Sequence, residues 1–297
     1  MKSQFVPTNF RANTLVLIEK CNVILDSYAA QGFDMTLRQL YYQLVQANEI
    51  HNNQRQYDRL GDIVNNARLA GLIDWDYIVD RTRSLRQLST WNSPSEIISV
   101  SAEQYRVDKW EGQLYRPEVW IEKEALAGVF ERVCNEMEVP YFSCRGYASI
   151  TALYSTWRRF KNYLAKGQIP YILHFGDHDP SGIDMTRDIT DRLIKFGLTP
   201  KLERMALNSE QVERFRPAPN FCKLSDSRAN GYIAKFGLES WELDALQPDV
   251  LAAIFRTEIE NLIDVSAWDS AVELEREQSA VLHKISDRFD EVVAFVG

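Results

Sequence analysis

The stretch YILHFGDHDPSGIDMTRDI, residues 171–189, sets an apolar run directly before two closely spaced aspartates. The run predicts a buried strand, Gly176 and Gly182 allow the tight turn after it, and the residues beyond the turn predict a helix. Residues two apart in a strand point to the same side, so the carboxylates of Asp177 and Asp179 can face one cation. An acidic turn on the surface is the alternative.

The same plan of strand, turn and helix recurs before and after this stretch. The segments EVWIEKEAL, VPYFSC and LTPKLERMAL each supply another apolar run. Strands that alternate with helices predict a parallel α/β sheet, and such sheets bind ligands beyond the carboxyl ends of their strands. Glu122 ends the first run, so we expect Glu122, Asp177 and Asp179 to hold a hard cation, Mg²⁺ with Mn²⁺ as a substitute.

Two histidines flank the aspartates and raise the alternative of a zinc site. We expect His174 to pack within the strand and His178 to face solvent, which disfavours zinc. The four cysteines are scattered without a C-x-x-C pair, which also argues against zinc and against a disulfide framework and fits a reducing cytoplasm.

The N-terminal part predicts three helices. The first lies in residues 11–33 and closes at Gly32, and the second begins after Thr36, whose capping box with Gln39 marks its N-terminus. A third helix, in residues 57–72, carries apolar residues at helical spacing. A strand-like segment at 74–80 follows, and a loop-like segment at 90–96 marks a boundary. This order predicts a winged helix-turn-helix, with a generic helical subdomain as the alternative.

Helix geometry separates the paired tyrosines of the second helix. At 100° per residue Tyr41 joins the apolar face, whereas Tyr42 falls on the polar side beside Arg38. We therefore expect Tyr41 in the core and Tyr42 exposed. An exposed phenol beside a guanidinium suits attack on a phosphate, because the cation holds the phosphate and favours the phenolate. A surface tyrosine that contacts DNA or covers apolar surface is the alternative.

Basic residues gather around the third helix and the segment after it. Arginines make bidentate contacts with phosphate, so they are candidates for binding double-stranded DNA, although a solvated helix face with ion pairs explains the same pattern. The candidates are Arg55, Arg59, Arg68, Arg81, Arg83 and Lys123.

The net charge of −8 is not spread evenly along the 297 residues. From Glu239 onward there are 14 acidic and 4 basic residues, so the first 238 residues carry a net charge of +2. A nearly neutral body still binds a phosphate backbone through local clusters of arginine. No segment has the apolar length of a signal peptide or a membrane span, so we expect a cytoplasmic protein without a membrane partner.

The segments VWIEKEAL and FGDHDPSGIDM together resemble a Toprim domain, in which a glutamate after one strand and a D-x-D after a later one hold Mg²⁺. TLRQLYYQLV resembles the tyrosine-bearing winged helix of topoisomerase VI A subunits and the related meiotic double-strand-break transesterases, and WELDAL, residues 241–246, resembles a late segment of that family. The resemblance implies that Tyr42 is the nucleophile, with Arg38 and Glu122 as catalytic partners.

The spacing between Tyr42 and Glu122 is longer than expected for that family. In those enzymes the tyrosine of one subunit meets the metal site of its partner, which implies a homodimer. The chain has no ATPase module, so strand passage would need a separate ATPase partner.

We therefore predict an α/β protein with a winged-helix domain at residues 1–112, a Toprim-like parallel-sheet domain at 113–239 and an acidic helical C-terminal segment at 240–297. The predicted function is Mg²⁺-dependent cleavage of DNA strands through Tyr42. Two alternatives remain open: a hydrolytic Toprim endonuclease of a defence or mobile-element type, in which activated water replaces the tyrosine, and a DNA-binding protein without catalysis.

Overall fold

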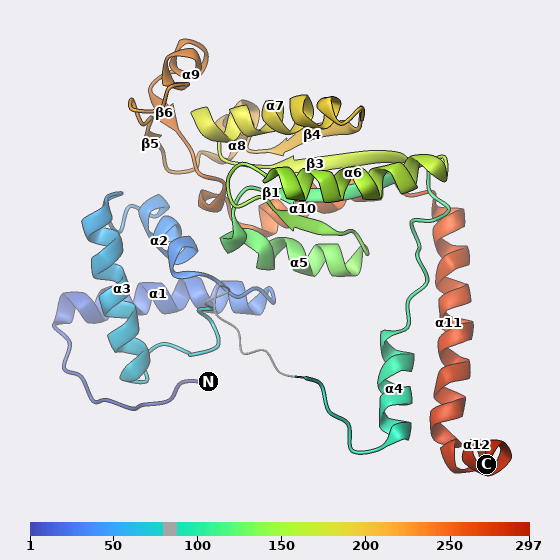
Figure 1. The fold of residues 1–297 in the computed structure, drawn as a ribbon. Coiled ribbons are helices and arrows are strands. Elements are labelled where there is room, and N and C mark those ends of the chain that lie inside the picture. The colour runs from blue at the N-terminus through green and yellow to red at the C-terminus, as the bar shows by residue number, and fades with distance from the viewer. Residues whose placement is uncertain (80–87) are drawn as a thin grey trace.

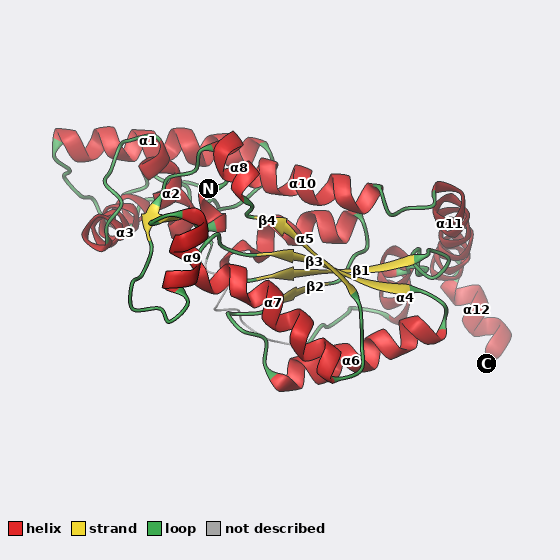
Figure 2. Ribbon diagram, turned by 90° about the horizontal axis from the view of Figure 1, so that it is seen from above, coloured by secondary structure: helices red, strands yellow, loops and turns green. Residues whose placement is uncertain are grey.

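A parallel sheet lies at the centre of the protein (Figures 1 and 2). The structure is a computed structural model that describes residues 1–79 and 88–297. Its sheet has the strand order β2-β1-β3-β4, and neighbouring strands run parallel, which confirms the predicted parallel α/β sheet. The strands are β1 (Tyr115–Ile121), β2 (Tyr141–Ser143), β3 (Ile169–Phe175) and β4 (Lys201–Ala206).

Helices cover both faces of the sheet because the side chains of each strand alternate between them. Val119 on β1 and Leu173 on β3 face one layer of helices, whereas Trp120 and Ile172 face the other. The first layer consists of α5 (Ala127–Glu136) and α10 (Pro248–Glu260), and the second of α6 (Ile150–Ala165) and α7 (Pro180–Lys195). Most residues of β1 and β3 are buried and apolar, with Glu118 of β1 and His174 of β3 as buried polar exceptions.

Three helices form a separate core at the N-terminus. The capping box of Thr36 and Gln39 is present, and the apolar stripe of Leu60, Val64 and Ala67 is buried, which confirms both sequence predictions. The helices are α1 (Ala12–Ala30), α2 (Leu37–Gln46) and α3 (Gln54–Leu69). Connections of six and seven residues join these helices, from Ala30 to Leu37 and from Gln46 to Gln54.

The expected wing strand does not form in residues 74–79. This segment turns, and its only ladder contact within the described residues is an isolated bridge between Met35 and Ile78. The guanidinium of Arg68 donates to the carbonyls of Trp75 at 2.8 Å and Ile78 at 3.1 Å. A strand keeps carbonyls three residues apart about 10 Å from each other, so one guanidinium can bind both only because the chain curls.

Residues 90–93 have no regular structure, and a helix begins at Pro94. The Ser93 hydroxyl accepts a hydrogen bond from the Glu96 amide and caps α4 (Pro94–Gln104). Helix α4 packs along α11 (Val265–Asp287), and with α12 (Phe289–Val296) they form an arm that extends away from the sheet (Figure 1). None of the residues of α11 is buried, in keeping with the acidic, charged sequence of this segment.

Short elements complete the fold beyond β4. They are α8 (Ser209–Phe215), α9 (Ala229–Phe236), the antiparallel pair β5 (Asn220–Phe221) and β6 (Glu239–Ser240), and the 3-10 turn η2 (Leu243–Ala245). A further 3-10 turn, η1 (Glu124–Leu126), lies between β1 and α5. The four cysteines are buried as free thiols. None of the helices formed by residues 1–79 and 88–297 combines the length and the apolar character of a bilayer-spanning segment.

Candidate active site

Glu122 and Asp177 meet at the carboxyl ends of two adjacent strands, as predicted. Ile121 pairs with Phe175 at the end of the ladder, so the next residues of β1 and β3 emerge side by side. The backbone amide of Asp177 donates to Glu122 Oε2 at 2.8 Å. A Cβ on Gly176 would lie 3.0 Å from the same oxygen, so glycine keeps the space that the carboxylate occupies.

Asp179 lies at the start of α7 and caps it. Its Oδ1 accepts a hydrogen bond from the Gly182 amide at 2.6 Å. A Cβ on Gly182 would come within 2.2 Å of the Asp177 carbonyl oxygen, so this turn requires glycine. Burial raises the pKa of Glu122, and the charge of Asp179 raises it further. Asp179, the third predicted ligand, is therefore close enough to Glu122 to affect its ionisation.

Lys123 forms an ion pair with Asp177, the first aspartate of the pair. Its ammonium lies 2.7 Å from Asp177 Oδ2, 2.6 Å from Glu242 Oε2 and 3.3 Å from Asp244 Oδ1. The Asp177 Oδ1 atom accepts the Leu243 amide at 2.9 Å. Lys123, predicted to contact DNA, is therefore the centre of an internal network of carboxylates.

Arg38 extends this network to the N-terminal helices. Its guanidinium binds Asp244 Oδ2 at 3.1 Å and forms a second ion pair with Glu242. Asp244 is almost completely buried, and its two cations come from α2 and from the end of β1. Residues 242–244 thus join the helical core to the sheet. Sequence analysis singled out the WELDAL segment but assigned no role to its two acids.

Tyr42 is buried, so the expected exposure of this residue is wrong. It is 5% exposed and Tyr41 is 4% exposed. Helical periodicity places Tyr42 on the polar side of α2 correctly, but that side is covered by η2. Its hydroxyl lies 3.4 Å from Arg38 Nη2, and the guanidinium carbon lies 5.6 Å from the ring centroid.

The electrostatics of Tyr42 also differ from the expectation that Arg38 favours the phenolate. Burial raises the pKa of the Tyr42 hydroxyl, the charge of Glu242 raises it further, and Arg38 offsets only part of this. The Glu242 carboxylate is held next to the phenol by Arg38, which donates to both groups. The phenol therefore keeps its proton in the folded protein, beside a carboxylate that can accept it.

The acids of the network divide into two kinds. Burial raises the pKa of Asp177 to about 8, with Lys123 opposing the shift, and burial also raises the pKa of Glu122. Burial acts in the same direction on Glu242, but Lys123 and Arg38 lower its pKa to about 2. Glu242 is thus the ionised member, whereas burial favours the protonated forms of Glu122 and Asp177.

The donor set at the strand ends suits a hard cation. Within the described residues the hydrogen bonds above occupy one oxygen each of Glu122 and Asp179, which leaves the other oxygen of each for an ion. Carboxylate oxygens are the ligands that Mg²⁺ prefers, and it needs few of them. In the described part of the chain, no three His, Cys, Asp or Glu side chains lie as close together as the ligands of a bound metal ion do.

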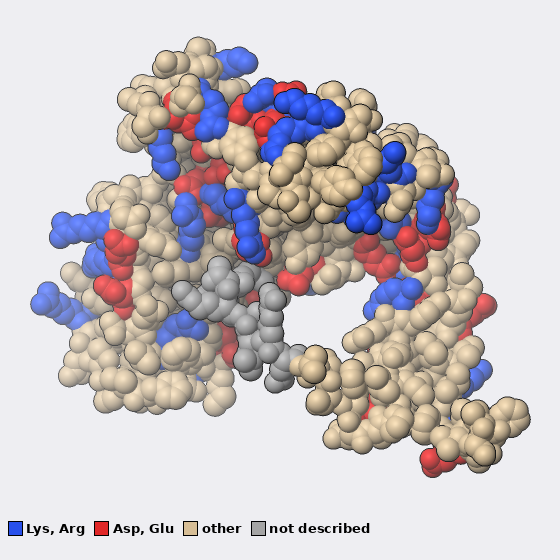
Figure 3. Space-filling model, in the orientation of Figure 1, with Lys and Arg blue, Asp and Glu red and all other residues tan. Residues whose placement is uncertain are grey.

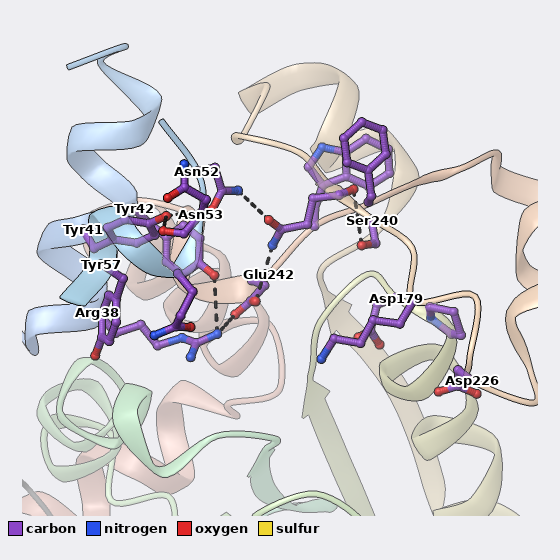
Figure 4. A pocket seen from close by; sticks show the side chains of 16 residues that line it. Arg38, Tyr41, Tyr42, Asn52, Asn53, Tyr57, Asp179, Asp226, Ser240 and Glu242 are labelled. Atoms are coloured by element: carbon purple, nitrogen blue, oxygen red, sulfur yellow. Dashed lines mark hydrogen bonds and ion pairs between the residues drawn. The ribbon is translucent and has the colours of Figure 1, made fainter. Parts of the chain in front are cut away.

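A cavity of about 430 Å³ opens beside α2 and the start of α3 (Figure 4). Its other wall consists of the start of α7 and the segments around β5 and β6. Arg38, Tyr42 and Asn52 line one wall, and Asp179 and Asp226 lie on the other. The predicted nucleophile and one predicted metal ligand therefore face the same space within one chain.

The two histidines are both buried, so the expected exposure of His178 is wrong. His178 Nδ1 lies 2.7 Å from Tyr232 Oη and its Nε2 lies 3.1 Å from Ser209 Oγ. His174 is fully buried, as expected for the strand, with Nδ1 at 2.8 Å from Thr186 Oγ1. His178 is buried because its backbone pairs with that of Trp241, which covers this part of the chain. Both of its ring nitrogens are occupied, which leaves none for zinc.

The candidate DNA contacts have different surroundings. Arg55 and Arg59 are exposed on α3. The guanidinium of Arg68 is instead held by backbone carbonyls and lies 4.5 Å from the Trp75 ring centroid. Arg81 and Arg83 lie outside the described residues. On the face shown in Figure 3, basic side chains over the N-terminal helices alternate with acidic ones.

Comparison with known proteins adds no family to this picture. No family model matches the chain, and no curated protein matches it either.

Proposed function

We propose that this protein cleaves DNA strands with the help of Mg²⁺ and that Tyr42 is the nucleophile. One observation carries the proposal: an unbroken path of contacts within one chain. It runs from the Tyr42 hydroxyl through Arg38, Glu242 and Lys123 to Asp177, whose amide binds Glu122. The winged-helix character of the N-terminal part and the Toprim character of the sheet belong to the same proposal.

The chemistry follows from the neighbours of the tyrosine. The Tyr42 oxygen attacks the phosphorus of a DNA phosphodiester, the phenolic proton passes to Glu242, and the bond from phosphorus to the leaving sugar oxygen breaks as that oxygen takes up a proton. The product is a phosphotyrosyl link and a free hydroxyl end. Arg38, beside the phenol, is placed to stabilise negative charge on the phosphate.

Glu122, Asp177 and Asp179 would hold Mg²⁺, with Mn²⁺ as a substitute, and the ion would replace Lys123 at Asp177 Oδ2. The ion supplies charge stabilisation and orientation for the transferred phosphate. Double-stranded DNA would approach over Arg55 and Arg59. One such site cuts one strand, so cleavage of both strands requires a homodimer, and strand passage would require a separate ATPase partner.

The test compares Tyr42→Phe with Tyr41→Phe in Mg²⁺ or Mn²⁺. Tyr41 is the matched control because it is the adjacent buried phenol, and its hydroxyl binds Asn52 Oδ1 at 3.0 Å. We expect end-labelled DNA to become covalently attached to the parent protein and to Tyr41→Phe but not to Tyr42→Phe, which also loses cleavage. An adduct that survives in Tyr42→Phe contradicts the proposal.

Hydrolysis by activated water is the second candidate, favoured by the burial and raised pKa of Tyr42. In that case Glu122, Asp177 and Asp179 keep their roles and the tyrosine is structural. Undiminished cleavage by Tyr42→Phe, with no adduct in the parent, supports this candidate over the first. Binding of DNA without cleavage under any divalent ion supports a DNA-binding protein instead.

A further inference from the structure

The cavity beside Tyr42 has an aromatic residue at its edge that the cleavage chemistry does not use. Phe221, at the end of β5, is 86% exposed although it lines the cavity. Tyr57 and Trp241, half-buried, line the same space. An aromatic ring left in water beside a cavity is costly to expose, and flat rings in such a place are surfaces on which nucleobases stack.

Side-chain amides form the second part of the lining. Asn52, Asn53 and Asn220 come together where α3 begins opposite β5. The Asn52 amide nitrogen donates to the Pro219 carbonyl at 3.3 Å and also binds the Asn220 side chain, which fixes both groups. Amides donate and accept hydrogen bonds at once, so they match the edges of bases rather than an apolar ligand.

Charged side chains of both signs line the cavity. The exposed Lys223 and the guanidinium of Arg38 line it, and so do the carboxylates of Asp179 and Asp226. A ligand with a phosphate fits the cations, whereas the acids would repel a phosphate placed against them unless a metal ion intervened. The volume of about 430 Å³ lies within the range of sites for small ligands and is ample for a single nucleotide.

We propose that this cavity receives one unpaired nucleotide, whose base stacks on Phe221 and is held by the amides of Asn52 and Asn220. The inference rests on the proposed function in one respect, because it takes the nucleotide to be part of the DNA that is cleaved. It narrows the substrate to DNA with an unpaired or extruded nucleotide next to the scissile phosphate. A free mononucleotide offers the same chemistry, and the experiment separates the two sources.

Binding is measured by fluorescence anisotropy in EDTA, so that no cleavage is needed for the result. The probes are a blunt duplex, the same duplex with one bulged nucleotide, and that bulged duplex in competition with free deoxynucleoside monophosphate. We expect the full-length protein to bind the bulged duplex at least about tenfold more tightly than the blunt one, since only the unpaired base can stack on Phe221. A 2-aminopurine at the bulge should lose fluorescence on binding as it stacks.

Phe221→Ala is the test variant, and Leu238→Ala is its control, because Leu238 is 59% exposed near the same hairpin and does not line the cavity. We expect Phe221→Ala to lose the preference for the bulge and the quenching while blunt-duplex affinity stays unchanged, and Leu238→Ala to keep both.

Equal affinity of the parent for the two duplexes overturns the inference. So does competition by micromolar mononucleotide without any preference for the bulge. A bulge preference in a protein that forms no adduct would leave the inference standing while the proposed cleavage failed.

Discussion

Glu242 is the residue on which the candidate site depends most. It binds the ammonium of Lys123 and forms an ion pair with Arg38, which also donates to the hydroxyl of Tyr42. An ionised, half-buried carboxylate near a protonated phenol is the candidate to take up the phenolic proton. It also occupies the two cations that a DNA phosphate would otherwise meet. Glu242 therefore activates the nucleophile and competes with the substrate.

These two roles predict a split result for Glu242→Gln. The cleavage rate should fall by about 10²- to 10⁴-fold, the usual loss when a general base is removed. The affinity for DNA should stay equal or rise, because Arg38 and Lys123 each lose a counter-charge. Single-turnover cleavage and anisotropy, measured on the same duplex, give the two quantities. A joint loss of affinity and rate would show that Glu242 is needed only to hold the fold.

The buried imidazole of His174 should make the protein less stable at acidic pH. Burial, with a further contribution from Arg204, lowers its pKa to about 3. The unfolded chain binds this proton below about pH 6.5, but the folded protein does not until about pH 3, so stability falls between these values. At pH 5 the loss is about 2 kcal/mol. His178 adds to it in the same direction, because burial lowers its pKa too.

The measurement is the free energy of unfolding in urea at pH 7 and pH 5. His174→Gln should reduce the difference between the two by about 2 kcal/mol, since it removes the group that titrates. His51→Gln, a change at an exposed histidine, serves as the control and should leave the difference unaltered. An unchanged pH dependence in His174→Gln would rule out this origin of the acid sensitivity.

Sequence reasoning at this scale succeeded where a local rule applies. Glu122 and Asp177 meet because neighbouring parallel strands end together. It failed for Tyr42, since a helical wheel identifies the polar side of α2 but not the segment that covers it. Asp244 was missed because its significance lies in partners that are far away in the chain.

Helix α2 shows how one element sets the geometry of the site. Its N-terminus is fixed by a capping box, and two turns carry Arg38 and Tyr42 to the cavity. Such caps and stripes are local, so they were predicted from the sequence. The conformation of residues 74–79 was not predicted, because this segment curls around Arg68, a residue of the preceding helix.

Thr36→Ala tests the contribution of this cap. The Thr36 hydroxyl accepts from the Gln39 amide, and the Thr36 amide donates back to Gln39 Oε1 at 2.8 Å. Loss of a threonine cap costs about 1 kcal/mol of unfolding free energy. Cleavage should fall as well, because fraying of α2 moves both Arg38 and Tyr42. Thr8→Ala, in the exposed N-terminal segment, should change neither quantity in the same denaturation and cleavage assays.

The whole molecule consists of a helical core, a sheet core and an arm that are joined at a few charged contacts. Residues 242–246 close the first junction, where Ala245 packs into the core of α1, α2 and α3. The second junction lies between the sheet and α11. Neither could be read from the sequence, because ion pairs between segments more than 100 residues apart leave no periodic pattern. The alternation of strands and helices, which is local, was sufficient to predict the sheet.

Lys109 should hold the arm to the sheet. It is 6% exposed and binds Glu275 Oε2 of α11 at 2.7 Å as well as Glu138, which follows α5. Beside it the rings of Trp110 and Trp268 meet edge to face at 5.5 Å between centroids. Lys109→Met removes the cation that Glu275 pairs with and leaves Glu138 with its longer ion pair to Arg106, at 3.8 Å. The loss of such a partly buried pair costs about 2–3 kcal/mol when some water still reaches the charges.

Lys166→Met is the matched control, because Lys166 pairs with Glu111 at 2.7 Å while both side chains are more than half exposed, at 54% and 61%. Such a surface pair contributes at most about 1 kcal/mol. Hydrogen exchange should then show faster exchange of α4 and α11 in Lys109→Met than in the control, with α1, α2 and α3 unchanged in both. Equal losses of unfolding free energy in the two variants would mean that the arm is held by its apolar contacts alone.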